Sequence, residues 1–227
     1  FFCFLPARIS RALTLNSVMI NLKIAIQKSG RLNEDSLTLL KECGISINNG
    51  KDQLMAQASN FRLDVLYLRN SDIPQYVRDG VADIAIIGDN TEKEKKTGIR
   101  HVLDLGFSRC RLSIAVPKNV DFQDISYLQG KKIATSYPNS LKDFLTENDI
   151  EAEIHEISGS VEIAPNIGLA DAICDLVSSG STLFKNGLKE VYKIFESQAI
   201  LVANSGLCGE KQELLAQLVF RIKAVLA

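Results

Sequence analysis

From Leu22 onward, short runs of β-branched and aliphatic residues alternate with helical stretches, and this alternation constrains the fold more than any other feature. The first unit joins a strand at 22–26 (LKIAI) to a helix that Gly44 ends. Asn33 is predicted to be the N-cap of that helix, followed by acidic residues where the helix dipole favours them. Such alternation is typical of α/β proteins with mainly parallel sheets.

The same pattern continues to Ala203 and divides the chain into two lobes. Strands are expected at 63–68, 82–88, 111–117, 131–135, 151–157, 171–177, 191–196 and 199–203, and helices at 72–79, 139–149, from about 182, and at 210–227. We expect residues 21–109 and 198–227 to form lobe I and residues 110–197 to form lobe II, with a ligand cleft between them. The charged stretch 91–98 (TEKEKKTG) is interpreted as a solvated surface turn or helix.

Charge and cysteine usage narrow the class of protein. A net charge of -1 gives no global basic field to hold nucleic acid or an anionic membrane, although a few Lys and Arg side chains suffice for an anionic small substrate. The five cysteines are widely spaced, include no C-x-x-C pair and accompany only two histidines. This pattern favours a reduced, cytoplasmic protein without a disulfide or zinc framework.

The first 20 residues differ from the rest of the chain, because they contain no Asp or Glu and do not begin with Met. A transit peptide or the end of a signal peptide has a similar composition. Their apolar run is too short to span a membrane. Met19 precedes the first strand and is the expected natural start, so residues 1–18 are interpreted as upstream translation or a disordered extension.

The segment 170–183 (ADAICDLVSSGSTL) indicates a strand, a turn and the start of a helix. The side-chain period of two in a strand puts Asp171 and Asp175 on the same face. The turn combines the permissive Gly180 and backbone N–H groups at a helix N-terminus with four hydroxyl side chains, those of Ser178, Ser179, Ser181 and Thr182. A carboxylate beside such a turn would hold ribose hydroxyls while the turn holds a 5′-phosphate. An exposed Ser-rich turn is the alternative interpretation.

A second candidate is the loop after the first strand, Lys28-Ser29-Gly30-Arg31. Two cations beside a glycine turn that leads into a helix suit a pyrophosphate or an ATP phosphate, although an ordinary cationic loop looks the same. Arg69, at the end of strand 63–68, would add to the same positive rim. The two histidines, His101 and His155, have no metal-ligand spacing and are interpreted as surface residues or residues behind a site.

The region that begins at Glu162 resembles the signature of the ATP phosphoribosyltransferase family. The matching positions are Glu162, Gly168, Ala170, Ile173, Asp175, Ser179, Gly180, Thr182 and Leu183. Further similar stretches lie at 24–32, 79–88, 110–117, 131–138 and 186–191. The resemblance therefore covers the chain from Leu22 to the C-terminus.

This resemblance implies a bilobal fold like that of type II periplasmic binding proteins, with the active site between the lobes. It also implies the first reaction of histidine biosynthesis (EC 2.4.2.17), in which adenine N1 of ATP attacks C1′ of phosphoribosyl pyrophosphate and pyrophosphate leaves. Lys28 and Arg31 would stabilise the leaving group with Mg²⁺, a cofactor expected on the substrate phosphates without protein ligands. Asp175 and the turn 178–182 would hold the sugar, whereas Gly30, Arg69 and Glu162 would form an ATP or pyrophosphate rim.

The resemblance leaves the partners open. Long-form members continue into a C-terminal domain that binds histidine, whereas this chain ends at Ala227. We expect either a truncated long form, active as a homo-oligomeric dimer or hexamer, or a short form with a histidyl-tRNA-synthetase-like regulatory subunit. The rivals are a non-enzymatic solute-binding module on the same scaffold and a phosphoribosyltransferase for another base.

Overall fold

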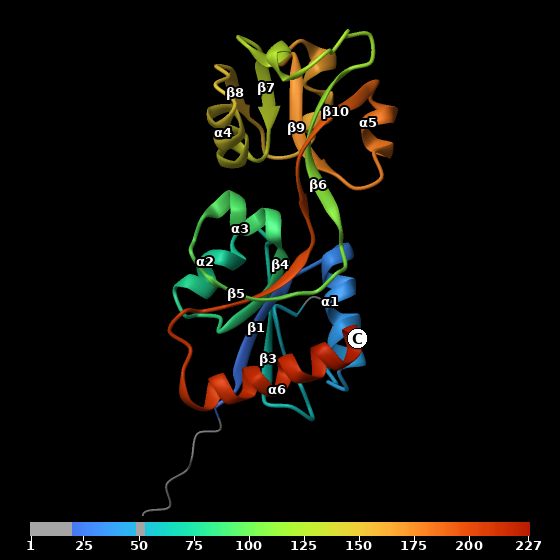
Figure 1. Cartoon of the computed structure of the whole chain (residues 1–227). Helices are drawn as coiled ribbons and strands as arrows, with labels where there is room; N and C mark the ends of the chain where they lie inside the picture. Colours follow the sequence, from blue (N-terminus) through green and yellow to red (C-terminus); the bar gives the residue numbers. More distant parts are fainter. Residues whose placement is uncertain (1–19, 49–52) are drawn as a thin grey trace, which may run out of the picture.

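The computed structural model describes residues 20–48 and 53–227, and the predicted start at Met19 and the extension before it lie outside the described residues. Two lobes lie one above the other and are joined by extended crossing segments (Figure 1). The two-lobed α/β arrangement confirms the predicted fold class. No helix in the described part of the chain is long and apolar enough to cross a bilayer.

Lobe I is built on a six-stranded sheet with the order β2-β3-β1-β4-β11-β5. Its strands are β1 (Leu22–Gln27), β2 (Met55–Gln57), β3 (Leu63–Leu68), β4 (Ile84–Gly88), β5 (Arg100–Asp104) and β11 (Ala199–Ala203). Its helices are α1 (Arg31–Glu42), α2 (Ile73–Arg78), α3 (Asp89–Lys95) and α6 (Gly209–Leu226). The apolar side chains of α1 and α6 share one core cluster with the sheet, and those of α2 share another.

Lobe II is built on a five-stranded sheet with the order β10-β6-β9-β7-β8. Its strands are β6 (Cys110–Pro117), β7 (Lys132–Thr135), β8 (Glu153–Glu156), β9 (Ala172–Val177) and β10 (Leu188–Ser197). Its helices are α4 (Pro138–Glu147) and α5 (Ser181–Lys185), with short 3-10 turns η1 (Ile125–Leu128), η2 (Val161–Ile163) and η3 (Pro165–Ile167). Helix α4 packs its apolar side chains on one face of the sheet, whereas η2 and α5 pack on the other.

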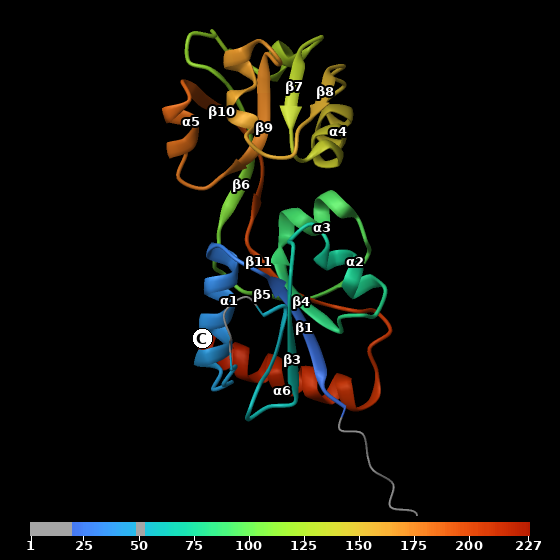
Figure 2. The same cartoon turned by 180° about the vertical axis from the view of Figure 1, so that it is seen from behind.

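The parallel strands of both lobes point their carboxyl ends at the boundary between the lobes. Arg31, which follows β1, contacts Ser178, which follows β9. On the other side of the boundary, Glu94 of α3 contacts Asn139 of α4. Figure 2 shows both sides of the boundary from behind, with α1 and α3 below it and the loops that follow β9 and β7 above it. Ligands of open α/β sheets bind outside the carboxyl ends of strands, so the fold predicts a ligand site at this boundary.

The sheets are mixed and not mainly parallel as predicted. β1 pairs in parallel with β3 and β4, and β7 pairs in parallel with β8 and β9. The remaining ladders are antiparallel. Most of them involve β6, β10 or β11, which belong to the two chain segments that cross between the lobes in opposite directions, whereas β2 and β3 pair within lobe I.

Two local predictions were wrong. Helix α1 begins at Arg31 and not after Asn33, because Gly30 has a φ of 88° and turns the chain from β1 straight into the helix. Asn33 instead donates its side-chain amide to the carbonyl of Gln27. The charged stretch 91–98 is not wholly solvated, since Thr91 and Glu94 of α3 are buried.

Candidate active site

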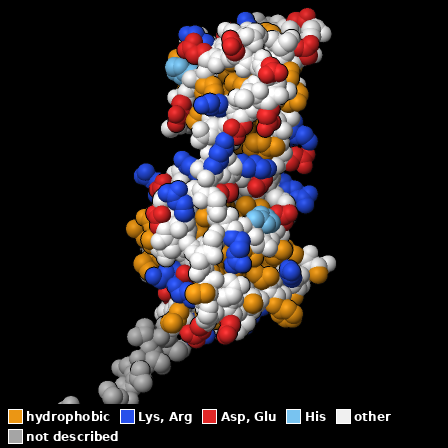
Figure 3. All heavy atoms as spheres, turned by 60° about the vertical axis from the view of Figure 1, so that its left-hand side comes forward, with side chains coloured by type: hydrophobic (Ala, Val, Ile, Leu, Met, Phe, Trp, Pro, Cys, Tyr) orange, Lys and Arg blue, Asp and Glu red, His pale blue; other side chains and the backbone are white. Residues whose placement is uncertain are grey.

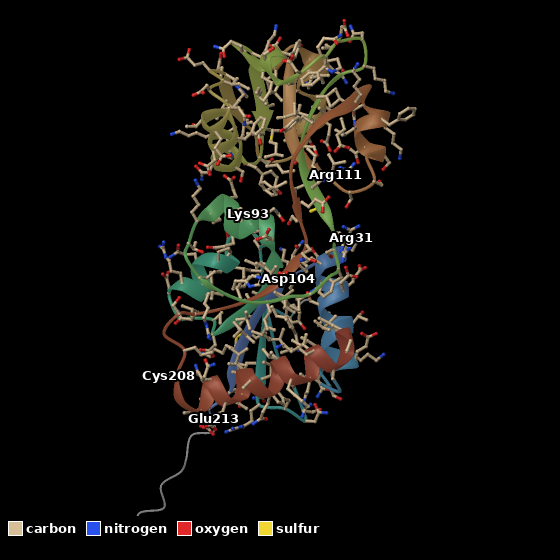
Figure 4. All side chains as sticks on the ribbon, in the orientation of Figure 1. Arg31, Lys93, Asp104, Arg111, Cys208 and Glu213 are labelled. Carbon is tan, nitrogen blue, oxygen red and sulfur yellow. The ribbon has the colours of Figure 1, made fainter. Side chains whose placement is uncertain are left out.

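The two loops singled out in the sequence meet where the lobes meet. The Arg31 guanidinium donates to Ser178 Oγ at 3.0 Å and to the Arg109 carbonyl at 3.5 Å. Figure 4 shows Arg31 at the top of α1 and Arg111 above it on β6, on the same side of the molecule. We call the pair Arg31–Ser178 the mouth contact; it is exposed and links lobe I to lobe II.

The turn after β9 offers unused hydrogen-bond donors. Gly180 has a φ of 76°, and Ser179 Oγ donates to Ser181 Oγ at 3.1 Å. In the described part of the chain, the backbone N–H groups of Ser179, Gly180 and Thr182 donate to no other group. The hydroxyl side chains of this turn are exposed, namely those of Ser178, Ser179, Ser181 and Thr182. Backbone N–H groups without a partner, together with exposed hydroxyl groups in the same turn, suit a phosphate.

Asp175 stands before this turn near the end of β9. Burial raises the pKa of its carboxyl to about 6, the nearby negative charge of Glu162 adds to the rise, and the Leu176 N–H opposes it. No Lys or Arg in the described ranges pairs with this carboxylate. A half-buried carboxylate without a cation is suited to accept hydrogen bonds from vicinal hydroxyls or to meet a cation carried by a ligand.

Asp171 is not part of this pocket, contrary to the prediction from strand periodicity. Strand β9 starts at Ala172, so Asp171 lies before it, exposed, and accepts a hydrogen bond from the Lys132 backbone N–H at 2.9 Å. A separation of four residues in extended chain is roughly 13 Å, which places Asp171 at the end of the sheet remote from the boundary. Its carboxylate ties the starts of β7 and β9 together.

Lys28 and Arg69 lie side by side at the boundary edge of lobe I. The Lys28 N–H donates to the Leu68 carbonyl at 2.9 Å, which brings the residue after β1 next to the residue after β3. Both side chains are exposed, and neither forms an ion pair with any acid in the described ranges. On the face drawn in Figure 3, Lys and Arg side chains gather at the waist between the lobes, with acidic side chains among them.

Sequence reasoning missed the arginines that support the turn. Arg111 forms a two-pronged pair with Glu190, whose pKa the Arg111 guanidinium holds below its usual range. The same guanidinium donates to the Ser178 carbonyl at 3.1 Å and so fixes the start of the turn. Arg109 lies next to it, and its carbonyl faces Arg31. The signal was available, since Arg111 falls within the family-like stretch CRLSIAVP.

A cavity of about 690 Å³ lies against the crossing strands and reaches the turn. It is lined by both arginines, three acids and the turn, namely Asp89, Asp104, Arg109, Arg111, Ser178 and Glu196, together with four neighbouring residues. This volume is within the range of sites for small molecules and cofactors. Among the described residues, no group of three His, Cys, Asp or Glu side chains is placed to hold a metal ion.

Comparison with known proteins agrees with this geometry. The ATP phosphoribosyltransferase family model matches residues 69–224. ATP phosphoribosyltransferase of Cytophaga hutchinsonii is 59% identical over 204 residues, which are 90% of this chain and 71% of that protein. The enzyme of Phocaeicola vulgatus is 53% identical over 91% of this chain and 73% of its own length.

Solved structures agree as well. The ATP phosphoribosyl transferase (HisG:HisZ) complex from Thermotoga maritima contains a chain similar to this one, with a TM-score of 0.78, 29% identity and coverage of 90% of this chain and 98% of that chain. A substrate-binding protein of an amino acid ABC transporter has a TM-score of 0.59 over 90% of this chain and 92% of its own, but only 13% identity, and so shows the fold alone. By its sequence and its architecture, the chain belongs to the ATP phosphoribosyltransferase family.

Proposed function

We propose that the boundary between the lobes joins ATP to phosphoribosyl pyrophosphate, the first step of histidine biosynthesis, with the mouth contact marking where the substrates meet. The observation that carries this proposal is the approach of Arg31 to Ser178, which puts a guanidinium that pairs with no acid of the described residues beside the turn after β9. Neither loop alone recognises a molecule with a phosphate at one end and a pyrophosphate at the other. Together they span both ends.

In this proposal the turn 178–182 holds the 5′-phosphate with its backbone N–H groups and its exposed hydroxyl groups, and Asp175 accepts hydrogen bonds from the ribose hydroxyls. Lys28 and Arg31 face the pyrophosphate, with Arg69 further along the same rim and Gly30 as the turn that brings Arg31 to it. Glu162 completes the rim proposed for ATP or pyrophosphate, and its negative charge also raises the pKa of the Asp175 carboxyl.

The reaction needs orientation and charge stabilisation more than proton transfer. The lone pair of adenine N1 forms a bond to C1′, and the electrons of the C1′–O bond leave with the pyrophosphate. Positive charge develops on the ribose, and negative charge develops on the leaving group. Lys28 and Arg31 stabilise the negative charge because they are placed before the reaction starts.

Mg²⁺ fits this pocket as an ion carried by the substrate. Asp175 offers one carboxylate without a cation, and Mg²⁺ commonly binds through one or two carboxylates together with substrate phosphates. Bound there, the ion would supply charge neutralisation of the phosphates. The remaining coordination positions would belong to substrate and water.

The test follows pyrophosphate release and the adenine absorbance change in a mixture of protein, ATP, phosphoribosyl pyrophosphate and Mg²⁺, with each component omitted in turn. Asp175→Asn is expected to lower kcat/KM by about 100-fold or more, because a neutral amide cannot match the charge-assisted hydrogen bonds of the carboxylate. Asp171→Asn is the matched control and is expected to stay within about twofold of the wild type. Equal losses in both variants would contradict the assignment of the pocket to the boundary end of β9.

We further propose that the protein is cytoplasmic and works as a homo-oligomer, a dimer or hexamer, or with a histidyl-tRNA-synthetase-like regulatory subunit. Support comes from the description of the Thermotoga maritima structure as a complex of two components. Light scattering of the chain alone, followed by the same assay with a candidate subunit added, distinguishes these assemblies. A strictly monomeric chain with full activity would contradict both.

A further inference from the structure

A second contact joins the lobes on the α3 and α4 side of the boundary, and it is built differently from the mouth contact. Glu94 on α3 of lobe I is 6% exposed. Its Oε1 accepts the Asn139 N–H at 2.9 Å, and its Oε2 accepts the Ser140 N–H at 2.9 Å and the Ser140 hydroxyl at 2.8 Å. The Glu94 carbonyl also accepts the Asn139 side-chain amide at 3.0 Å. We call this set the closure contact.

The closure contact supplies a helix cap from the opposite lobe. Helix α4 begins at Pro138 after Tyr137, whose side chain makes no cap hydrogen bond. Pro138 has no N–H, and the Leu141 N–H already donates to the Tyr137 carbonyl. The N–H groups of Asn139 and Ser140 are therefore the ones left without an intrahelical partner, and the Glu94 carboxylate accepts both of them.

Glu94 also has no cation to neutralise it. Asp83 and Glu94 are the buried carboxylates of the described residues, and Asp83 pairs with Lys211 at 2.8 Å within lobe I. In the described part of the chain, no Lys or Arg pairs with Glu94. A buried charge is stable only where hydrogen bonds and favourable dipoles compensate its desolvation, and here the N-terminus of α4 provides both. Separation of the lobes would remove that compensation.

The closure contact is connected to the candidate active site through Tyr137. This residue directly precedes the capped end of α4 and is half-buried at the boundary. Thr135 at the end of β7 pairs with Cys174 of β9, which places Tyr137, two residues later, beside the end of β9 that carries Asp175. Burial raises the pKa of the Tyr137 hydroxyl, and the negative charges of Asp175 and Glu94 add to the rise. Tyr137 lines a cavity of about 410 Å³ with residues of both lobes, including Asn70, Thr91, Glu94, Ser136 and Asn139. Figure 1 shows α3 directly below α4 there.

We propose that Glu94 is a positioning residue that holds the two lobes closed and thereby sets the affinity for phosphoribosyl pyrophosphate. The carboxylate touches no substrate. It favours the arrangement in which α4 and Tyr137 lie against lobe I and in which Arg31 reaches the turn after β9. A protein that is closed for only a fraction of the time binds with an apparent Kd divided by that fraction. The inference on affinity depends on the proposed function, whereas the inference on closure does not.

The decisive variant is Glu94→Gln, which keeps the shape but removes the charge and turns one acceptor into a donor that faces an N–H group. Its matched control is Glu92→Gln on the same helix, because Glu92 caps Gly98 and binds Thr97 entirely within lobe I. Small-angle scattering without ligand is expected to show a larger radius of gyration for Glu94→Gln than for the wild type or Glu92→Gln. Saturating phosphoribosyl pyrophosphate is expected to restore the wild-type value.

Calorimetric titration and steady-state kinetics give the second readout. For Glu94→Gln we expect the Kd and KM for phosphoribosyl pyrophosphate to rise about 10-fold, with kcat within about twofold, because saturating substrate closes the lobes again. Ser140→Ala, which removes one donor on the opposite lobe and leaves the carboxylate in place, is expected to move KM in the same direction by about two- to threefold. It keeps the proposal testable if Glu94→Gln does not fold.

Unchanged radius of gyration and unchanged Kd in both variants would overturn the proposal. A loss of kcat at unchanged Kd would also overturn it, because that result describes a purely structural glutamate. If Glu94→Gln opens the lobes while no variant, nor the wild type, binds phosphoribosyl pyrophosphate, the closure contact stands and the proposed substrate fails.

Discussion

The mouth contact and the closure contact, which both join the lobes, differ in burial and in the use of their polar groups. In the mouth contact, the exposed Arg31 guanidinium meets a neutral hydroxyl and a backbone carbonyl. In the closure contact, the Glu94 carboxylate is buried, and both of its oxygens accept N–H groups of the opposite lobe. In the mouth contact, most N–H donors of the Arg31 guanidinium stay available for a ligand. In the closure contact, both carboxylate oxygens of Glu94 are already used.

This difference separates a group that binds substrate from a group that holds the protein in shape. An exposed arginine loses little when a phosphate replaces a serine hydroxyl, because a charge-assisted, two-pronged hydrogen bond is stronger than a neutral one. A buried carboxylate that leaves a helix N-terminus loses its compensation and must be hydrated again. We therefore expect changes at the mouth to act on catalysis and changes at the closure contact to act on stability and affinity.

The largest effect is expected for Arg31→Ala, which should lower kcat/KM by about 100-fold through loss of charge stabilisation on the leaving pyrophosphate. The free energy of unfolding should change by less than about 0.5 kcal/mol, because the side chain is exposed. Arg62→Ala is the control, since Arg62 pairs with Glu210 away from the boundary. Steady-state kinetics and urea unfolding measure the two quantities. A large loss of stability with retained activity would reverse the roles of the two contacts.

Asp175 lies on β9 three residues before Ser178 of the mouth contact, and Asp175→Asn is expected to raise the free energy of unfolding at pH 8 by about 1–3 kcal/mol. The folded pKa is about 6, whereas an unfolded aspartate has its ordinary pKa near 4. The folded state binds the proton more tightly, so the wild-type stability from this group is greatest below pH 4 and is lost as the pH rises through 6. Urea unfolding at pH 4 and pH 8 tests this sign, and the stabilisation should disappear at pH 4.

The same raised pKa gives the activity a pH limit. We expect kcat/KM for phosphoribosyl pyrophosphate to fall about fivefold between pH 6 and pH 5, because protonated Asp175 is a weaker acceptor for ribose hydroxyls. Steady-state kinetics across pH 5–8 checks this, with Asp175→Asn as the variant that lacks the titration. A flat profile in the wild type would separate Asp175 from substrate binding. The residual activity of Glu94→Gln should follow the wild-type profile.

The smallest effect is expected for Lys96→Ala. Lys96 and Asp143 also join the lobes, at 2.8 Å, but both side chains are about half exposed. Exposed ion pairs contribute roughly 0–1 kcal/mol and are screened by salt. The KM for phosphoribosyl pyrophosphate should therefore change less than about twofold. If Lys96→Ala raised this KM as much as Glu94→Gln does, an exposed ion pair would hold the lobes together as well as the buried carboxylate. Burial of Glu94 would then not explain its effect.

Local patterns in the sequence carried much of the fold and part of the site. The β-branched runs, the turn residues around Gly180 and the cations around Gly30 are features of short segments, and each is recognisable without its partner. Strand periodicity placed Asp171 beside Asp175, but the start of β9 at Ala172 moved it out of the pocket. Periodicity predicts which face of a strand a side chain lies on, but it does not predict where the strand begins. The prediction for Asp171 was wrong for this reason.

The sequence by itself therefore determined the α/β character, the division into two lobes and the family. Only the tertiary structure decided which charged residues work as pairs. Glu94 and Ser140 are 46 positions apart, and Arg111 and Glu190 are 79 positions apart. The physical reason is that a charged side chain is buried, and its lost hydration is replaced by hydrogen bonds, only where groups of the opposite lobe pack against it. The run TEKEKKTG looks solvated until the N-terminus of α4 packs on it.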